Sequence, residues 1–165
     1  MKKILFVCSG NTCRSPLAEV IAKQVLPARV DFPLVIASAG TSALEGSPAS
    51  RYSIEVAEAH GLDLSQHRAH LLDPARVRDA DLIVTMGMRH IDTVGALDPA
   101  AREYAFLLTN FSEHHDGDIP DPIGGPMDVY VRTYGVIREC IESMAEQLGR
   151  FDGWKPESKE RRKDS

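Results

Sequence analysis

The sequence predicts a single-domain α/β fold, in which one four-stranded parallel sheet has helices on both faces. Short apolar segments alternate along the chain with segments whose apolar residues recur at helical spacing, an order typical of parallel sheets. The length of 165 residues suits one domain with a sizeable core. The expected strands are residues 3–7, 34–39, 81–85 and 103–108, and the expected helices are residues 16–26, 48–60, 89–94 and 127–148.

The first expected strand leads into a loop of distinctive composition, Cys-Ser-Gly-Asn-Thr-Cys-Arg-Ser-Pro, at residues 8–16. Cys8 stands at the end of the strand and Arg14 follows six residues later, with Gly10 and Asn11 between them. Such a loop points successive backbone N–H groups inward, and the helix that follows adds positive potential. A phosphate-sized anion would fit there, with Cys8 beneath it and the Arg14 guanidinium holding two of its oxygens.

The same positive field favours the thiolate form of Cys8, which is the nucleophilic form. The loop therefore predicts a phosphate-transfer site with a sulfur nucleophile, and the alternative is a structural cysteine in a strand–helix turn. We expect the phosphate group to be bound by Ser9, Gly10, Asn11, Thr12, Cys13, Arg14 and Ser15.

The expected helix starts follow from their capping residues. Pro16 suits the first helical position and Ser15 the N-cap of the first helix. Glu19 lies one residue late for a capping box, which would leave the Ser15 hydroxyl able to face the Cys8 thiolate instead. The helix at residues 48–60 has Ser47 as its expected cap and a glycine directly after its end.

The last expected helix has one continuous core face, because its apolar residues alternate spacings of four and three. These residues are Tyr130, Tyr134, Ile137, Ile141, Met144 and Leu148. Beyond this helix the chain is rich in charge and has no apolar spacing. We therefore expect a folded domain at residues 1–150 and a disordered polar tail at residues 151–165.

The composition limits the classes of partner. Asp and Glu total 24 against 19 Lys and Arg, which does not indicate a nucleic-acid-binding surface. No apolar run has the length of a membrane span, and the run at residues 4–7 is too short for a signal peptide. Three cysteines, an odd number, favour a reducing compartment. We expect a cytoplasmic protein without nucleic-acid or membrane partners, and a monomer is the favoured oligomeric state.

We expect no cofactor and no metal ion. The run His114-His115-Asp116 is a candidate metal motif, but adjacent histidines lack the spacing of ligands on a helix or strand. A solvated loop is the simpler interpretation of this segment.

Residues 8–19 resemble the signature loop of the low-molecular-weight protein-tyrosine phosphatases. That family also carries an Asp-Pro general-acid motif before its last helix, which here is Asp121-Pro122. The resemblance covers about residues 2–150 in the family's order. Further matching segments are residues 38–41, 64–69 and 81–86.

This resemblance implies a cysteine-dependent phosphatase that acts on phosphorylated protein side chains. It implies that Cys8 forms a phosphocysteine intermediate, that Arg14 holds the phosphoryl group, and that Asp121 protonates the leaving group and then activates water. Several other acidic residues lie in the same part of the chain, and Asp118 is the second candidate for the acid. They are Glu113, Asp116, Asp118, Asp128 and, farther on, Glu139.

The family also implies that polar side chains brace the loop by hydrogen bonds. The matching residues are Asn11, Ser15, Ser38 and His67, and the alternative for His67 is an exposed histidine at a helix cap. Cys13 shares the loop with the nucleophile, so we expect it to form a disulfide with an oxidised Cys8 and prevent over-oxidation. The alternative for Cys13 is a purely packing role.

Two positions bear on the leaving group. Phosphotyrosine-selective members usually have an aliphatic residue where Thr12 stands, and aromatic residues where this chain has Ile123-Gly124-Gly125 after the Asp-Pro motif. At both positions the chain resembles the bacterial protein-arginine phosphatases of the family. A threonine hydroxyl accepts a hydrogen bond from a guanidinium, whereas phosphotyrosine offers no donor there. Phosphoarginine is therefore favoured and phosphotyrosine comes second; the alternative is that Thr12 is a neutral substitution.

Two other functional classes are kept as alternatives. A thiol-dependent arsenate reductase shares the fold and the loop, but it relays electrons through a downstream pair of cysteines, and this chain has only Cys140 after Cys13. A non-catalytic phosphate-binding module is the second alternative. The presence of both a nucleophile and a candidate acid argues against it.

Overall fold

A parallel sheet of four strands forms the centre of the molecule, as expected from the alternating pattern. The computed structural model describes residues 1–150, so the expectation of a disordered tail at residues 151–165 lies outside the described residues. The strands are β1 (Lys2–Cys8), β2 (Leu34–Gly40), β3 (Leu82–Thr85) and β4 (Ala105–Leu107), in the spatial order β2-β1-β3-β4. All three neighbouring pairs are parallel, and Cys8 lies opposite Gly40 at the ends of β1 and β2.

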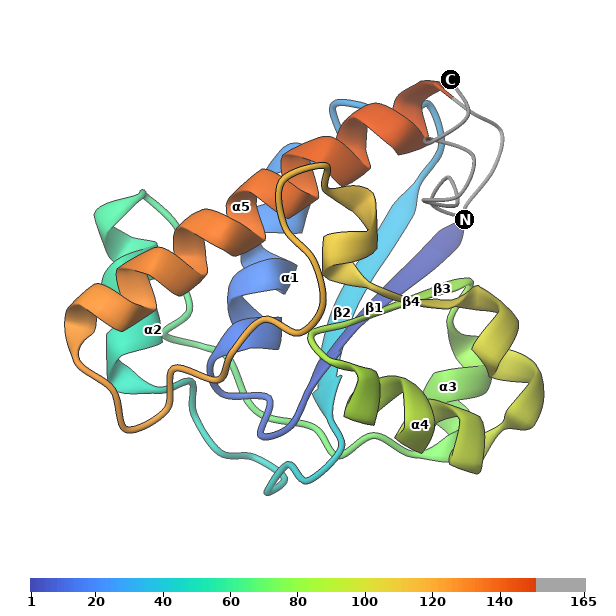
Figure 1. The fold of residues 1–165 in the computed structure, drawn as a ribbon, viewed down its shortest axis with the longest axis horizontal. Coiled ribbons are helices and arrows are strands. Elements are labelled where there is room, and N and C mark those ends of the chain that lie inside the picture. The colour runs from blue at the N-terminus through green and yellow to red at the C-terminus, as the bar shows by residue number, and fades with distance from the viewer. Residues whose placement is uncertain (151–165) are drawn as a thin grey trace.

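Helices cover both faces of the sheet (Figure 1). The helices are α1 (Arg14–Val25), α2 (Arg51–Ala59), α3 (Pro74–Asp79), α4 (Met88–Leu97) and α5 (Met127–Arg150). Successive side chains of a strand point to opposite faces. Ile4 and Phe6 of β1 accordingly pack in the core under α1 and α5, whereas Leu5 and Val7 pack in the core under α3 and α4. This two-sided burial explains why the first strand is apolar throughout.

The strand order creates a switch point beside β1. The chain runs from β1 to β2 on one side and later returns to β3 on the other side of β1. Open parallel sheets bind ligands outside the carboxyl ends of their strands at such a point. Cys8, the last residue of β1, lies there. Within residues 1–150, no helix combines the length and the apolar character needed to cross a membrane.

Several element boundaries differ from the expected ones, and each difference has a local cause. Helix α1 begins at Arg14, so Ser15 and Pro16 lie inside it and Ser15 is not its cap. Helix α2 begins at Arg51 because the Ser50 hydroxyl, not Ser47, accepts the capping bond from the backbone of Ser53. Strand β4 is shorter than expected, because the 3₁₀ helices η1 (Pro99–Tyr104) and η2 (Leu108–Phe111) flank it.

Gly40, the last residue of β2, lies close to the backbone of the loop after β1. A Cβ atom at this position would overlap the carbonyl oxygen of Ser9 and lie 2.8 Å from the backbone nitrogen of Asn11. Both are backbone atoms, so the loop itself would have to move. We therefore expect Gly40→Ala to lower the melting temperature and to weaken the binding of inorganic phosphate, measured by titration calorimetry.

A second glycine provides the control for this substitution. Gly135 lies inside α5, and a Cβ there has no described atom within 4 Å. Gly135→Ala should stabilise the protein by about 0.5–1 kcal/mol and leave phosphate affinity unchanged. Unaltered phosphate affinity in Gly40→Ala would show that the loop does not depend on this close approach.

Candidate active site

Cys8, the last residue of β1, and the loop that follows it direct four carbonyl groups outward. Each carbonyl accepts a hydrogen bond from a neighbouring segment. The backbone nitrogens of Thr41 and Ser42 donate to the carbonyls of Cys8 and Ser9, both at 2.9 Å. His67 Nε2 donates to the carbonyl of Asn11 (2.7 Å), and the backbone nitrogen of Ser50 donates to the carbonyl of Thr12 (2.8 Å). In a trans peptide, the N–H of the next residue points opposite to the carbonyl. The N–H groups of Ser9, Gly10, Thr12 and Cys13 therefore face the inside of the loop, and we call these four groups the anion cradle.

Asn11 supports the loop from its centre. Its backbone is in the left-handed region, with φ of 54°, and its side chain is fully buried. The Asn11 side-chain amide donates to the hydroxyls of Ser15 (2.8 Å) and Ser38 (2.9 Å), and its oxygen accepts from the backbone of His70 (2.9 Å). Asparagine tolerates this backbone conformation better than most residues do. Its side-chain bonds therefore fix the point where the loop reverses direction.

The Ser15 hydroxyl lies between the side-chain amide of Asn11 and the sulfur of Cys8. Ser38 donates its one hydroxyl proton to Glu19 (2.7 Å), so its oxygen is left to accept from Asn11. Ser15 likewise accepts from Asn11 and lies 2.9 Å from the sulfur of Cys8. The Ser15 proton is therefore available to the sulfur, which also lies 3.3 Å from the backbone nitrogen of Asn11. Asn11 N and, where Ser15 donates, the Ser15 hydroxyl thus both lie within hydrogen-bond distance of the sulfur.

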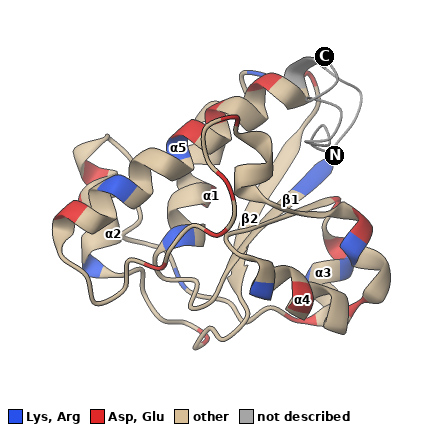
Figure 2. Ribbon diagram, viewed as in Figure 1, with Lys and Arg blue, Asp and Glu red and all other residues tan. Residues whose placement is uncertain are grey.

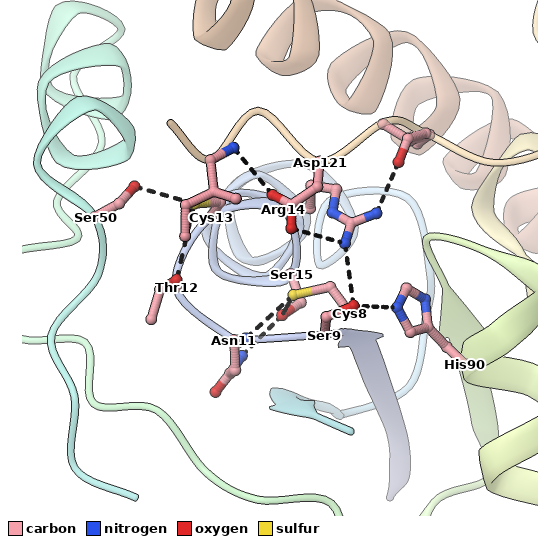
Figure 3. A network of polar contacts seen from close by, with 12 residues as sticks. Cys8, Ser9, Asn11, Thr12, Cys13, Arg14, Ser15, Ser50, His90 and Asp121 are labelled. Carbon is pink, nitrogen blue, oxygen red and sulfur yellow. Dashed lines mark hydrogen bonds and ion pairs between the residues drawn. The ribbon is translucent and has the colours of Figure 1, made fainter. Parts of the chain in front are cut away.

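Arg14 lies beside the cradle with its guanidinium held in place (Figure 3). Its Nη1 donates to the carbonyl of Ile119 (2.8 Å), and its Nη2 lies 3.5 Å from both the Ser9 hydroxyl and the Asp121 carboxylate. The side chain is buried, yet Nε finds no hydrogen-bond partner among residues 1–150. A buried, unpaired donor of a charged group is costly unless an anion takes it up. An anion in the cradle would supply that partner.

Several acidic residues lie along the segment between η2 and α5 (Figure 2), and each has different partners in the structure. Asp121 is the one that reaches Arg14, and its other carboxylate oxygen accepts from the backbone of Ile123 (3.1 Å). Asp118 instead accepts from the backbone nitrogen of Met88 at the start of α4 (2.9 Å). Of the acidic residues farther along, Asp128 pairs with Arg132 and Glu139 pairs with His115.

The remaining sequence-predicted residues lie around the loop. His67 is half-buried and donates to the Asn11 carbonyl, and burial lowers the pKa of its ring, which favours the neutral form.

Cys13 is buried, and its sulfur donates to the Ser50 hydroxyl (3.3 Å) and lies 3.6 Å from the Tyr130 hydroxyl. Within the described part of the chain, the Thr12 hydroxyl makes one weak contact, 3.8 Å from the Cys13 sulfur. Ile123 is 64% exposed beside Asp121.

Sequence reasoning missed two residues of this site. Glu19 was part of the matching motif but had no assigned role, and its bond to Ser38 became visible only in the structure. His90 of α4 had no sequence signal at all; its Nε2 lies 2.9 Å from the Ser9 hydroxyl. Burial, together with the charge of Arg14, lowers the pKa of His90 to about 4.

Comparisons with known proteins agree with this geometry. The family model of the low molecular weight phosphotyrosine protein phosphatases matches residues 3–152. A protein-arginine-phosphatase of Geobacillus stearothermophilus is 36% identical over 146 residues, which are 88% of this chain and 95% of that protein. The low molecular weight protein-tyrosine-phosphatase PtpB of Staphylococcus epidermidis is 39% identical over 143 residues, 86% of this chain and 96% of the relative.

A solved structure adds information on the chemistry. The YwlE arginine phosphatase in which serine replaces the active-site cysteine, with that serine phosphorylated, superimposes with a TM-score of 0.84. It is 28% identical, and the match covers 93% of this chain and 99% of that one. A phosphorylated residue at the nucleophile position is consistent with a phosphocysteine intermediate. The chain therefore belongs to the low-molecular-weight protein-tyrosine phosphatase family and is a cysteine-dependent protein phosphatase.

Proposed function

We propose that the enzyme removes phosphoryl groups from arginine side chains of proteins. The observation that carries this proposal is the Thr12 hydroxyl, which belongs to the loop that forms the cradle and has one weak contact among residues 1–150. It therefore keeps the capacity to accept a hydrogen bond from a guanidinium N–H. The segment after Asp121-Pro122 continues with Ile123-Gly124-Gly125 and offers no aromatic ring to stack on a phenol. The arginine-phosphatase relatives support the same choice.

In the first chemical step, the Cys8 sulfur attacks phosphorus from beneath the cradle. The S–P bond forms while the P–N bond to the arginine side chain breaks, and Asp121 donates a proton to the departing nitrogen. The cradle N–H groups and Arg14 stabilise the charge that develops on the phosphoryl oxygens. In the second step, Asp121 takes a proton from water, the water oxygen bonds to phosphorus, and the S–P bond breaks to return the thiolate and release phosphate.

Phosphotyrosine is the second candidate substrate, because a tyrosine phosphatase is among the relatives of comparable identity. The same steps apply, with a P–O bond broken instead of the P–N bond. Arsenate reduction lacks support, because Cys140 lies fully buried within α5 and burial raises its pKa to about 11. A thiol in that state is a poor relay for electrons from Cys8.

Asp121 is expected to act as the general acid, and the leaving group tests this role. Asp121→Asn should lower kcat/KM for phenyl phosphate by about 10²–10⁴-fold, and for p-nitrophenyl phosphate far less, because p-nitrophenol leaves with little protonation. Asp118→Asn is the matched control, since its amide oxygen can still accept from Met88. Steady-state kinetics on both substrates would reject the assignment if Asp118→Asn showed the selective loss instead.

Thr12 is expected to select the leaving group. Thr12→Ile removes the hydroxyl and adds bulk, so kcat/KM for a phosphoarginine peptide should fall roughly tenfold to a hundredfold, the worth of a hydrogen bond to a charged group. For a phosphotyrosine peptide, kcat/KM should stay the same or rise. An equal loss on both peptides would mean that Thr12 shapes the loop only. A wild-type preference for phosphotyrosine would refute the proposed substrate and leave the cysteine mechanism intact.

Cys13 is expected to protect the nucleophile from over-oxidation by forming a disulfide with Cys8 after peroxide treatment. The three cysteines are free thiols in the structure, and Cys13 must first leave its contacts with Ser50 and Tyr130. Non-reducing peptide mass spectrometry should detect the Cys8–Cys13 bond, and a thiol should restore activity. Equal recovery of wild type and Cys13→Ala, with no such bond, would leave Cys13 with a packing role.

A further inference from the structure

His90 is a buried polar residue that none of the chemical steps above employs. It lies in α4, on the opposite face of the sheet from α1, and is only 4% exposed. Its Nε2 is 2.9 Å from the Ser9 hydroxyl, and its Nδ1 is buried without a hydrogen-bond partner within the described part of the chain. A buried histidine that leaves one nitrogen unpaired carries an energetic cost. The bond between His90 and Ser9 links α4 to the loop of the active site.

The Ser9 hydroxyl lies between His90 and Arg14. Figure 3 shows its oxygen in contact with the His90 ring on one side and with the Arg14 guanidinium on the other. We propose that His90 is a positioning residue, which holds the Ser9 hydroxyl as an acceptor for Nη2 of Arg14 and so fixes the guanidinium against bound phosphate. This inference rests on the proposed role of Arg14 in holding the phosphoryl group.

The neutral form of the His90 ring suits this role in either tautomer. If Nε2 accepts, the Ser9 proton goes to the ring and the oxygen lone pairs remain for Arg14. If Nε2 donates, the Ser9 oxygen accepts from the ring and from Arg14 together, because a hydroxyl oxygen has two lone pairs. A protonated ring would instead place a second positive charge next to the guanidinium.

The charged groups around His90 act in both directions on its protonation. Burial is the largest influence that lowers the pKa of the ring to about 4, and the charges of Arg14 from α1 and Arg89 from α4 lower it as well. Asp118 and Asp121, both from the segment before α5, act in the opposite direction without cancelling the shift. The ring is therefore neutral at neutral pH.

The Ser9 hydroxyl supports Arg14 at Nη2, the nitrogen of the guanidinium that is held less firmly by other groups. Nη1 has a short bond to the Ile119 carbonyl, whereas the contacts of Nη2 with described residues are two at 3.5 Å, to Asp121 and to Ser9. As a general acid, Asp121 must carry a proton before it acts, and a neutral carboxyl group attracts the guanidinium much less. At that stage the Ser9 hydroxyl is the remaining described side-chain acceptor near Nη2, and His90 holds it.

The test measures the inhibition constant of inorganic phosphate together with kcat and KM for p-nitrophenyl phosphate. His90→Leu fills the buried position with an apolar side chain and removes the nitrogen that bonds Ser9. We expect it to raise the inhibition constant roughly tenfold, the effect of losing one hydrogen bond that supports a charged group. His90→Gln can place an amide group near the position of Nε2 and should restore most of the phosphate affinity. Ser9→Ala should match His90→Leu.

A double variant and a control separate this role from a general loss of stability. Because both side chains act through one contact, Ser9→Ala combined with His90→Leu should be no weaker than the poorer single variant. His60→Leu is the control, since His60 bonds the Val56 carbonyl and stacks on Tyr134 in another part of the molecule. It should leave the inhibition constant unchanged.

Arg14→Lys distinguishes failure of this inference from failure of the proposed phosphate site. If Arg14→Lys raises the inhibition constant and the His90 and Ser9 variants leave it unchanged, the positioning role is refuted and the phosphate site stands. If Arg14→Lys also has no effect, the phosphate site itself is wrong. An NMR titration of the wild-type ring with a midpoint near 6.5, the ordinary value for histidine, would also overturn the inference, because the ring would then be charged in slightly acidic solution.

Discussion

The left-handed backbone of Asn11, held by its own buried side chain, is the constraint on which the site depends. Three hydrogen bonds from one amide group fix the residue to α1, to β2 and to the segment that follows α2. The reversal of the loop at Asn11 directs its carbonyl to His67 and the next N–H to the inside. The same amide group also donates to the Ser15 hydroxyl, which lies 2.9 Å from the Cys8 sulfur. The Asn11 side chain therefore fixes both the shape of the cradle and the position of the hydroxyl next to the nucleophile.

The rest of the site comes from the far end of the chain and depends on the sheet for its position. The backbone nitrogen of Ile119 donates to the carbonyl of Met86, which directly follows β3, while the Ile119 carbonyl accepts from Arg14. Asp121 follows two residues later and is stiffened by Pro122. Because β1 and β3 are neighbours, Cys8 and Asp121, the proposed nucleophile and acid, meet at the carboxyl ends of adjacent strands. The parallel sheet therefore brings together residues more than one hundred positions apart.

The sequence was sufficient to predict the sheet, its helices on both faces and the family, because each depends on local patterns. The strand–loop–helix order around Cys8 and the core face of α5 are features of short segments. Helix starts were less predictable, because Ser47 and Ser50 are equally suitable caps in sequence. Tertiary bonds favour the later one: the Ser47 carbonyl accepts from Ala69 N, and Ser50 N donates to the Thr12 carbonyl. Helix α3 was missed although Asp73-Pro74 is a good start signal, because six residues give too short a pattern.

The site residues also fall into those that a local motif predicts and those that depend on tertiary contacts. Cys8 and Arg14 lie in one contiguous motif, whereas Glu19 and His90 act through contacts that no local pattern encodes. His90 is separated from Ser9 by 81 positions and reaches it only because α4 follows β3, the neighbour of β1. A single histidine on an amphipathic helix has no feature in the sequence that would distinguish it from an ordinary core residue.

The dissociation constant of inorganic phosphate for Asn11→Gly, measured by titration calorimetry, tests the central claim most directly. Glycine adopts a φ of 54° without strain, so this variant removes the side-chain hydrogen bonds and leaves the backbone conformation accessible. If these bonds shape the cradle, phosphate binding should weaken at least about tenfold while thermal unfolding stays cooperative. Wild-type affinity for phosphate in Asn11→Gly would contradict the account, because the loop would then keep its shape without them.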